Sequence, residues 1–255
     1  MSNVKSDPAS IRKALVTGSS RGIGLSIAKV LASHGVDICI TGRNFESLLK
    51  AKRQILDYAQ PHCDTPECGL VFPIQVDLGL PETPAILMDK TIESLGSLDL
   101  LVNNAGISLS TPLEETTIEQ WNTIMAINAR APYFLCKQAL PYLRNSFSPT
   151  IVQIASVVAY EGYVDQSAYT ASKHALLGFT KSLAKEVHED GIRIHTISPG
   201  GVATDMIGAV RPDIDTSALI DPDEIAQMVW FLVSHRGNAM VDHVAIHRSS
   251  KLPWT

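Results

Sequence analysis

Short apolar segments alternate with longer amphipathic segments along almost the whole chain, and this alternation limits the possible folds more than any other feature. The short segments read as strands buried on both faces, whereas the longer ones carry apolar residues at helical spacing. Strands are predicted at Lys13–Gly18, Val36–Gly42, Gly69–Val76, Leu98–Asn104, Thr150–Ser156, Ile192–Ser198 and near Met240–Ile246. Helices are predicted at Ile23–Gly35, Phe45–Ala59, Glu82–Leu95, Thr117–Leu143, Ser167–Glu189 and Asp223–Ser234. The pattern predicts a doubly wound α/β fold with a parallel sheet between helices.

The chain is expected to form one domain over residues 1–255. Its 255 residues would allow two small domains by length alone. With 45% hydrophobic and 18% charged residues, however, it can bury a large core. No linker rich in Gly, Pro or Ser and no repeat divides it. We expect a flexible N-terminus over residues 1–12.

Charge and hydropathy exclude several classes of protein. The net charge is −5 and no run of Lys or Arg occurs, so we expect no nucleic-acid partner. The uncharged stretch Asn145–Tyr160 is too short and too polar to span a membrane, and the first residues lack the apolar core of a signal peptide. Four cysteines are too few for a disulfide framework in a chain this long. These features predict a cytoplasmic protein in a reducing compartment.

A metal site is not expected. The segment from Gln60 to Gly69 contains His62, Cys63 and Cys68. This spacing lacks the second pair of ligands that a zinc site needs. We interpret the segment as a surface loop.

A glycine-rich segment, Thr17–Gly24, lies between the first predicted strand and the first predicted helix. Its spacing is G-x-x-x-G-x-G. Glycines at such a turn let the backbone approach a pyrophosphate, which binds at a helix N-terminus. A Walker-type phosphate loop is excluded because the Gly-Lys-Ser/Thr ending is missing. The alternative is that the glycines only bend the chain.

The end of the second predicted strand bears on the choice of nicotinamide cofactor. NAD sites usually have a carboxylate here, which binds the adenosine ribose. This chain has Gly42 and Arg43 instead, and Arg21 adds a second guanidinium from the glycine turn. Two guanidinium groups would suit the 2′-phosphate of NADP. The alternative is that both are solvated surface arginines.

Three further motifs give the chain a family resemblance. Asn103-Asn104-Ala105-Gly106 closes the fourth predicted strand, Ser156 ends the fifth, and Tyr169-Thr170-Ala171-Ser172-Lys173 opens a helix. Together with Thr17–Gly24, they resemble the short-chain dehydrogenase/reductase family, in order and spacing, from Lys13 to about Val233. The resemblance implies a Rossmann-like domain with a seven-stranded parallel sheet of order 3-2-1-4-5-6-7, and a homotetramer.

The resemblance also implies the site residues. The catalytic set is Asn128, Ser156, Tyr169 and Lys173. The set that binds NADP(H) is Gly18, Ser20, Arg21, Gly22, Ile23, Gly24, Arg43, Asp77, Leu78, Asn104, Ala105, Gly106, Tyr169, Lys173, Pro199, Gly200, Val202 and Thr204.

The expected chemistry is proton transfer beside a hydride transfer. Tyr169 and Lys173 are four residues apart, so both project from one helix face. We expect the ammonium to lower the pKa of the phenol, which could then act as acid or base. Ser156 would hold the substrate oxygen, and the resemblance implies that Asn128 positions a water that relays protons to Lys173. Taken singly, the same residues could be a helix-start aromatic, a strand-end cap and a solvated lysine.

Three functions stay open at this stage. The first is an NADP(H)-dependent carbonyl reductase or alcohol dehydrogenase, with a 3-oxoacyl thioester as one candidate substrate. An acidic acyl carrier protein would then need basic residues near the site, and Arg130 and Lys137 are the candidates. The second is a sugar, polyol or other small-alcohol dehydrogenase using NAD(P). The third is a non-catalytic nucleotide-binding regulator or scaffold.

Two variable segments are expected to shape the substrate site and the assembly. Residues 200–221 form a predicted substrate loop, in which Met206, Ile207 and Val210 would be an apolar lid facing Val158 and Tyr163. Residues 248–255 form a tail without the Asp-Gly-Gly with which the resembling family often ends, and it would contribute to contacts between subunits. The other expected interface positions are Phe134, Leu176, Phe179 and Leu183.

Overall fold

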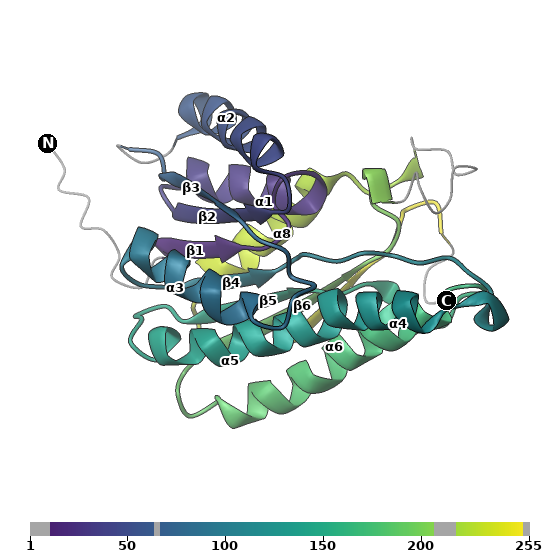
Figure 1. Ribbon diagram of the computed structural model, residues 1–255. Helices are drawn as coiled ribbons and strands as arrows, with labels where there is room; N and C mark the ends of the chain where they lie inside the picture. The colour runs from purple at the N-terminus through teal and green to yellow at the C-terminus, as the bar shows by residue number, and fades with distance from the viewer. Residues whose placement is uncertain (1–10, 64–66, 207–217, 252–255) are drawn as a thin grey trace, which may run out of the picture.

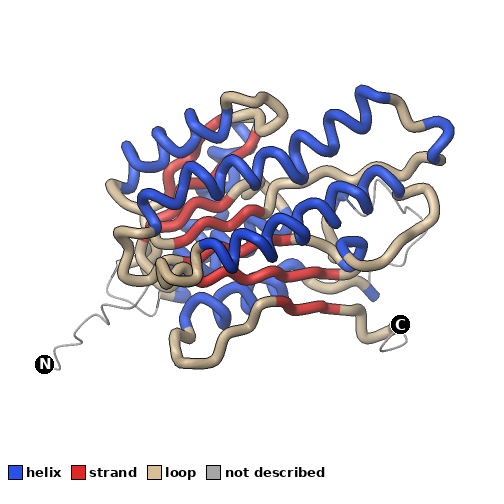
Figure 2. Tube along the Cα trace, turned by 90° about the horizontal axis from the view of Figure 1, so that it is seen from below, coloured by secondary structure: helices blue, strands red, loops and turns tan. Residues whose placement is uncertain are grey.

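Seven parallel strands form one sheet with helices on both faces (Figure 1). This computed structural model describes residues 11–63, 67–206 and 218–251. The strand order is β3-β2-β1-β4-β5-β6-β7, as predicted. Helices α1, α2 and α8 lie on one face, and α3 to α6 lie on the other (Figures 1 and 2). The order reverses beside β1, which opens a crevice at the carboxyl ends of the strands.

The elements agree closely with the predicted segments. The strands are β1 Lys13–Val16, β2 Asp37–Gly42, β3 Val71–Gln75, β4 Leu100–Asn103, β5 Thr150–Ile154, β6 Arg193–Pro199 and β7 His243–Ile246. The longer helices are α1 Gly22–Ser33, α2 Phe45–His62, α3 Thr83–Leu95, α4 Ile118–Met125, α5 Ala131–Leu143, α6 Ser167–Glu186 and α8 Pro222–Ser234. The short ones are η1 Leu113–Glu115, η2 Ala126–Arg130 and η3 Val157–Ala159.

The alternation of side chains along each strand divides the core into two layers. On β1, Ala14 and Val16 pack with α1, α2 and α8, whereas Leu15 packs with α3 and α5 on the other face. All three are fully buried. Since both faces of the sheet are covered, strands with apolar residues at consecutive positions are the expected sequence signature.

The predicted helix over Thr117–Leu143 is wrong in one respect. It is divided into α4 and α5 by the π-helical turn η2. A π turn inserts an extra residue into the helix and commonly marks a functional site. The periodicity of apolar residues does not reveal this insertion because both flanking helices keep their buried faces.

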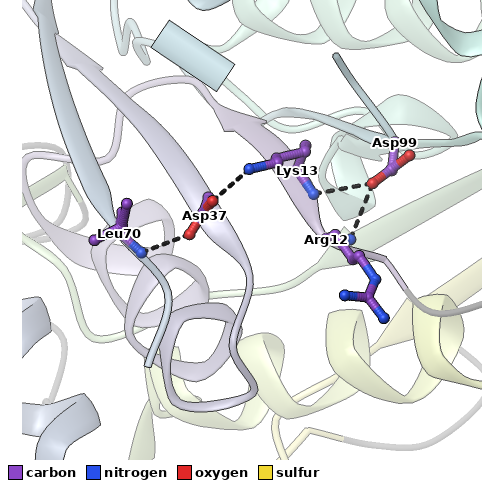
Figure 3. Close-up of polar contacts among 5 residues, drawn as sticks. All are labelled: Arg12, Lys13, Asp37, Leu70 and Asp99. Atoms are coloured by element: carbon purple, nitrogen blue, oxygen red, sulfur yellow. Dashed lines mark hydrogen bonds and ion pairs between the residues drawn. The ribbon is translucent and has the colours of Figure 1, made fainter. Parts of the chain in front are cut away.

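The first described residues, Ile11 and Arg12, are held in place, although they fall within the segment 1–12 that was expected to be flexible. Ile11 is buried in the core. The backbone N–H groups of Arg12 and Lys13 both donate to Asp99 Oδ2 at 3.0 Å (Figure 3). Asp37 binds the Lys13 ammonium and accepts from Leu70 N at 2.8 Å (Figure 3). These two carboxylates tie strands together at the end of the sheet opposite the crevice. Residues 1–10 lie outside the described part.

One pair of cysteines differs from expectation. Cys63 and Cys68 form a disulfide, while Cys39 and Cys136 are free and buried. The bond joins the end of α2 to the segment before β3, so cysteine usage no longer argues for a reducing compartment.

The described residues contain no group of three His, Cys, Asp or Glu side chains placed to hold a metal ion. No helix in the same ranges is long and apolar enough to cross a membrane.

Candidate active site

A cavity of about 460 Å³ lies at the carboxyl ends of the strands. Its lining residues follow β1, β2, β3, β4, β5 and β6, and others come from η3, α6 and the tail after β7. In a parallel sheet the carboxyl ends meet at one edge, so loops far apart in sequence can form a single site there.

The turn after β1 approaches the turn after β4 so closely that it needs glycine. Gly18 has φ +63°, and a Cβ there would lie 2.8 Å from Ala105 Cα. A Cβ on Gly24 would lie 2.5 Å from Asn104 Nδ2 and 2.6 Å from Gly18 O. Gly18 lines the cavity, whereas Gly24 does not. Gly24 therefore permits close packing of the two turns behind the cavity lining.

Asn104 joins these two turns by hydrogen bonds. Its Nδ2 donates to Thr17 O at 2.9 Å and Gly18 O at 3.1 Å. Thr17 Oγ1 accepts from the backbone N–H groups of Asn104 and Ala105, both at 3.0 Å. The side-chain amide of Asn104 therefore fixes the shape of the glycine turn.

The N-terminus of α1 points its first N–H groups toward the cavity. Its N-cap, Arg21, makes no capping hydrogen bond through its side chain, and no acidic residue occurs in the first turn. Gly22 and Ile23 line the cavity. Uncapped N–H groups at a helix N-terminus attract anions. This end of the cavity therefore fits the pyrophosphate of a dinucleotide.

The two arginines expected at the 2′-phosphate both line the cavity. Arg43 follows Gly42 at the end of β2, and its backbone O accepts from Gln75 Nε2 at 2.9 Å. Arg21 Nη1 is 2.9 Å from Asp205 Oδ2, so it has an anionic partner that sequence reasoning missed. Because both side chains of this pair are more than 70% exposed, the pair is weak.

Ser156, Tyr169 and Lys173 line the other end of the cavity. Lys173 is 4% exposed, and its Nζ donates to Ile154 O at 3.0 Å. Ser156 ends the strand segment as N-cap of η3. Tyr169 and Lys173 lie one turn apart on α6. The three residues predicted as a catalytic group are thus brought together from β5 and α6.

The expected effect of Lys173 on Tyr169 is wrong in this structure. Burial raises the pKa of Tyr169, and a hydrogen bond with Ser156 only partly opposes it. Burial lowers the pKa of Lys173 to about 8. Desolvation disfavours the charged form of each group, so the phenol stays protonated at neutral pH.

Asn128 lies behind the cavity, within the π turn η2. It is 1% exposed. Its Nδ2 donates to Ile107 O at 2.8 Å and Ser172 Oγ at 3.0 Å, and its Oδ1 accepts from Ile107 N at 2.9 Å. Asn128 therefore links the turn after β4 to α6, and it does not line the cavity.

Most of the other predicted cofactor-binding positions also line the cavity. The lining includes Ser20, Asp77, Leu78, Asn104, Ala105, Gly106, Pro199, Gly200, Val202 and Thr204. Val158, Tyr163 and Met206 line it too, whereas Ile207 and Val210 lie outside the described residues. Sequence reasoning missed Ser108, Gln166, His247, Arg248 and Lys251, which no local motif distinguishes.

The sheet order, the crevice and the glycine turn define the class: a Rossmann-like α/β protein with a nucleotide crevice. The chain belongs to the short-chain dehydrogenase family, whose model matches residues 12–215. It is therefore an oxidoreductase by family.

Three similar proteins illustrate this membership. A 3-oxoacyl-acyl-carrier-protein reductase of Chlamydia muridarum is 32% identical, over 91% of this chain and 94% of that protein. Carbonyl reductase family member 4 of Xenopus laevis is 35% identical, over 86% of this chain and 89% of that protein. A metagenomic short-chain oxidoreductase solved in complex with NADP is 28% identical, with TM-score 0.79, over 96% and 100%.

Proposed function

We propose that this protein is an NADP(H)-dependent oxidoreductase that interconverts a carbonyl compound and a secondary alcohol. One observation carries the proposal: a single cavity has Ser156, Tyr169 and Lys173 at one end and the glycine turn with Arg21 and Arg43 at the other. The names of the two relatives, a 3-oxoacyl reductase and a carbonyl reductase, support carbonyl reduction. The NADP-bound neighbour supports the cofactor.

The chain's own residues would bind the cofactor and move a proton. The uncapped turn of α1 binds the pyrophosphate, and the nicotinamide, when bound, supplies the hydride. Ser156 donates a hydrogen bond to the carbonyl oxygen of the substrate. Tyr169 gives that oxygen a proton during reduction and takes it back during oxidation. The raised pKa of Tyr169 keeps the proton on the phenol until the carbonyl oxygen becomes more basic.

Lys173 and Asn128 would support this proton transfer. Lys173 would bind the nicotinamide ribose from its buried position on α6. The site that a Cβ on Gly106 would occupy lies 3.3 Å from Asn128 Oδ1 and 3.5 Å from Lys173 Nζ, so the two polar groups face the same small space. A water that relays protons from Lys173 would be held there by Asn128.

The narrower assignment to 3-oxoacyl thioesters has weaker support. Arg130, one of the two expected docking cations, donates through Nη2 to Gly79 O. Because this hydrogen bond engages the Arg130 guanidinium within the subunit, Arg130 is less available to an acidic carrier protein. Sugar and polyol substrates therefore stay open as an alternative.

Loss of the Tyr169 hydroxyl tests the proposal. Tyr169→Phe should lower kcat at least about 100-fold, because general acid–base catalysis contributes about 100- to 10,000-fold. Binding of NADPH should change little. Tyr58→Phe on α2, whose ring stacks on His62 away from the cavity, is the matched control. Near-normal kcat in the Tyr169 variant would refute the proposed mechanism.

We also propose that the protein is a homotetramer. Phe134 is 39% exposed on α5, and Phe179 and Leu183 are half-buried on α6, so the two helices expose apolar surface. Leu176 was expected there as well, but it is buried against Ala155 and Ala159 within the subunit. The apolar surface of α5 and α6 is the proposed subunit interface.

A further inference from the structure

The C-terminal tail contributes two cations to the cavity, Arg248 and Lys251, and no step described above uses them. Both line the same cavity as Ser156 and Tyr169, as does the neighbouring His247. They follow β7, the edge strand from which the chain leaves the sheet (Figure 2). The tail is therefore part of the wall around the reacting end of the site.

Hydrogen bonds fix the tail at both of its described ends. At the first end, Gly200 N donates to Ile246 O at 2.8 Å, so the tail leaves β7 directly beside the turn after β6. At the second end, Lys251 Nζ donates to Tyr163 OH at 3.2 Å and lies 3.5 Å from Glu161 Oε2. Tyr163 OH in turn donates to Glu161 Oε2 at 2.9 Å. Arg248 lies between these two attachments.

The described part of the tail contains one cation without an anionic partner. Lys251 is paired with Glu161, and Asp205, an acid that also lines the cavity, is paired with Arg21. Arg248 makes no ion pair with any residue in the described ranges. Its backbone O accepts from Lys251 N at 2.9 Å, which closes a turn and fixes the backbone at Arg248. The guanidinium is therefore available to a ligand.

The position of the tail separates Arg248 from the cofactor phosphates. Five strand spacings lie between β2, which carries Arg43, and β7. At about 4.8 Å per spacing, the two strands are roughly 24 Å apart. The pyrophosphate site at α1 follows β1, four spacings from β7. The reacting end of the cavity follows β5 and β6, beside the tail. An anion bound by Arg248 therefore belongs to the substrate.

We propose that Arg248 binds an anionic group, a carboxylate or a phosphate, on the carbonyl substrate. This inference rests on the proposed function and deepens it. A guanidinium offers a planar pair of N–H donors that matches either anion. Lys251 is the positioning residue, because its contacts with Tyr163 and Glu161 hold the tail at the mouth of the cavity.

Matched charged and neutral substrates test this proposal. The first pair is 4-oxopentanoate and 4-oxopentanamide, and the second is dihydroxyacetone phosphate and dihydroxyacetone. Arg248→Gln should raise KM for a charged member about 10- to 150-fold, the range for a hydrogen bond to a charged group, and leave its neutral partner unchanged. Arg248→Lys should raise KM for the charged substrate by less, because lysine keeps the positive charge. Arg53→Gln on the exposed face of α2 is the control and should change neither.

The outcomes separate this inference from the proposed function. If KM of Arg248→Gln rises for the carboxylate substrate or for the phosphate substrate, the substrate pair that shows the rise identifies the anion. Equal losses on charged and neutral substrates, or no loss on either, would overturn the role of Arg248. If no carbonyl compound is reduced, the proposed function fails. Titration of the NADPH-loaded protein with pentanoate, pentanamide and inorganic phosphate would then still test Arg248, since no turnover is needed. Equal binding of these probes by wild type and Arg248→Gln would refute the proposal.

Discussion

The choice between NADPH and NADH should depend on Arg43. Its side chain is exposed beside the cavity, and its backbone is fixed because Gln75 binds its carbonyl and Val76 N donates to Gly42 O at 3.0 Å. The 2′-phosphate of NADP carries about −1.5 to −2 charges. Hydrogen bonds to a charged group are worth about 1.5–3 kcal/mol, so Arg43→Ala should weaken NADPH binding about 10- to 150-fold. NADH binding should not change.

Arg21 should contribute less than Arg43 because it must first leave Asp205. An exposed ion pair of this kind is worth about 0–1 kcal/mol. Asp205→Asn should therefore strengthen NADPH binding by at most about fivefold. Gly42→Asp should reverse the preference, since a carboxylate there repels the phosphate and can bind ribose. A Cβ on Gly42 would be 3.3 Å from Ser20 Oγ, so the side chain fits with a small shift of Ser20.

The assay is kcat/KM and Kd for each cofactor with wild type, Arg43→Ala and the surface control Arg53→Ala. A selective loss of NADPH binding in the Arg43 variant supports the assignment. Equal use of both cofactors by wild type, or equal losses of both in Arg43→Ala, would refute the reasoning and favour NAD.

Three further predictions follow from the buried groups and the exposed helices. Because the pKa of Lys173 is about 8, kcat/KM for NADPH should fall as pH rises through that value and the ammonium is lost; a profile flat to pH 10 would contradict its role. Burial lowers the pKa of His195, so as the pH falls below about 6.5 the unfolded chain takes up a proton more readily than the folded protein does. The free energy of unfolding should then decrease from pH 6.5 to 5, and His195→Gln should reduce this slope in urea titrations; an unchanged slope would show that His195 is not its source. Light scattering should give a tetramer, and Phe134→Glu should shift it toward smaller species; a wild-type monomer at micromolar concentration would exclude the assembly.

The sequence by itself determined the sheet, its helices and most of the cavity lining. Apolar strands such as Lys13–Val16 need cover on both faces, which only a parallel sheet between helices provides. The glycine turn and the pair Tyr169 and Lys173 were visible because their chemistry depends on short spacings along the chain. Local interactions of this kind are encoded within a few residues.

Tertiary structure alone decided the features that depend on segments distant in sequence. Gly24 packs behind the cavity because Asn104 lies against it, and Arg21 meets Asp205 from a loop that follows β6. The pKa of Tyr169 is raised because burial outweighs the hydrogen bond with Ser156, a balance that the spacing to Lys173 does not show. Arg248 reaches the substrate end because β7 pairs with β6, which places the tail beside Gly200. Burial and charge pairing depend on which distant segments meet, and no local pattern records that.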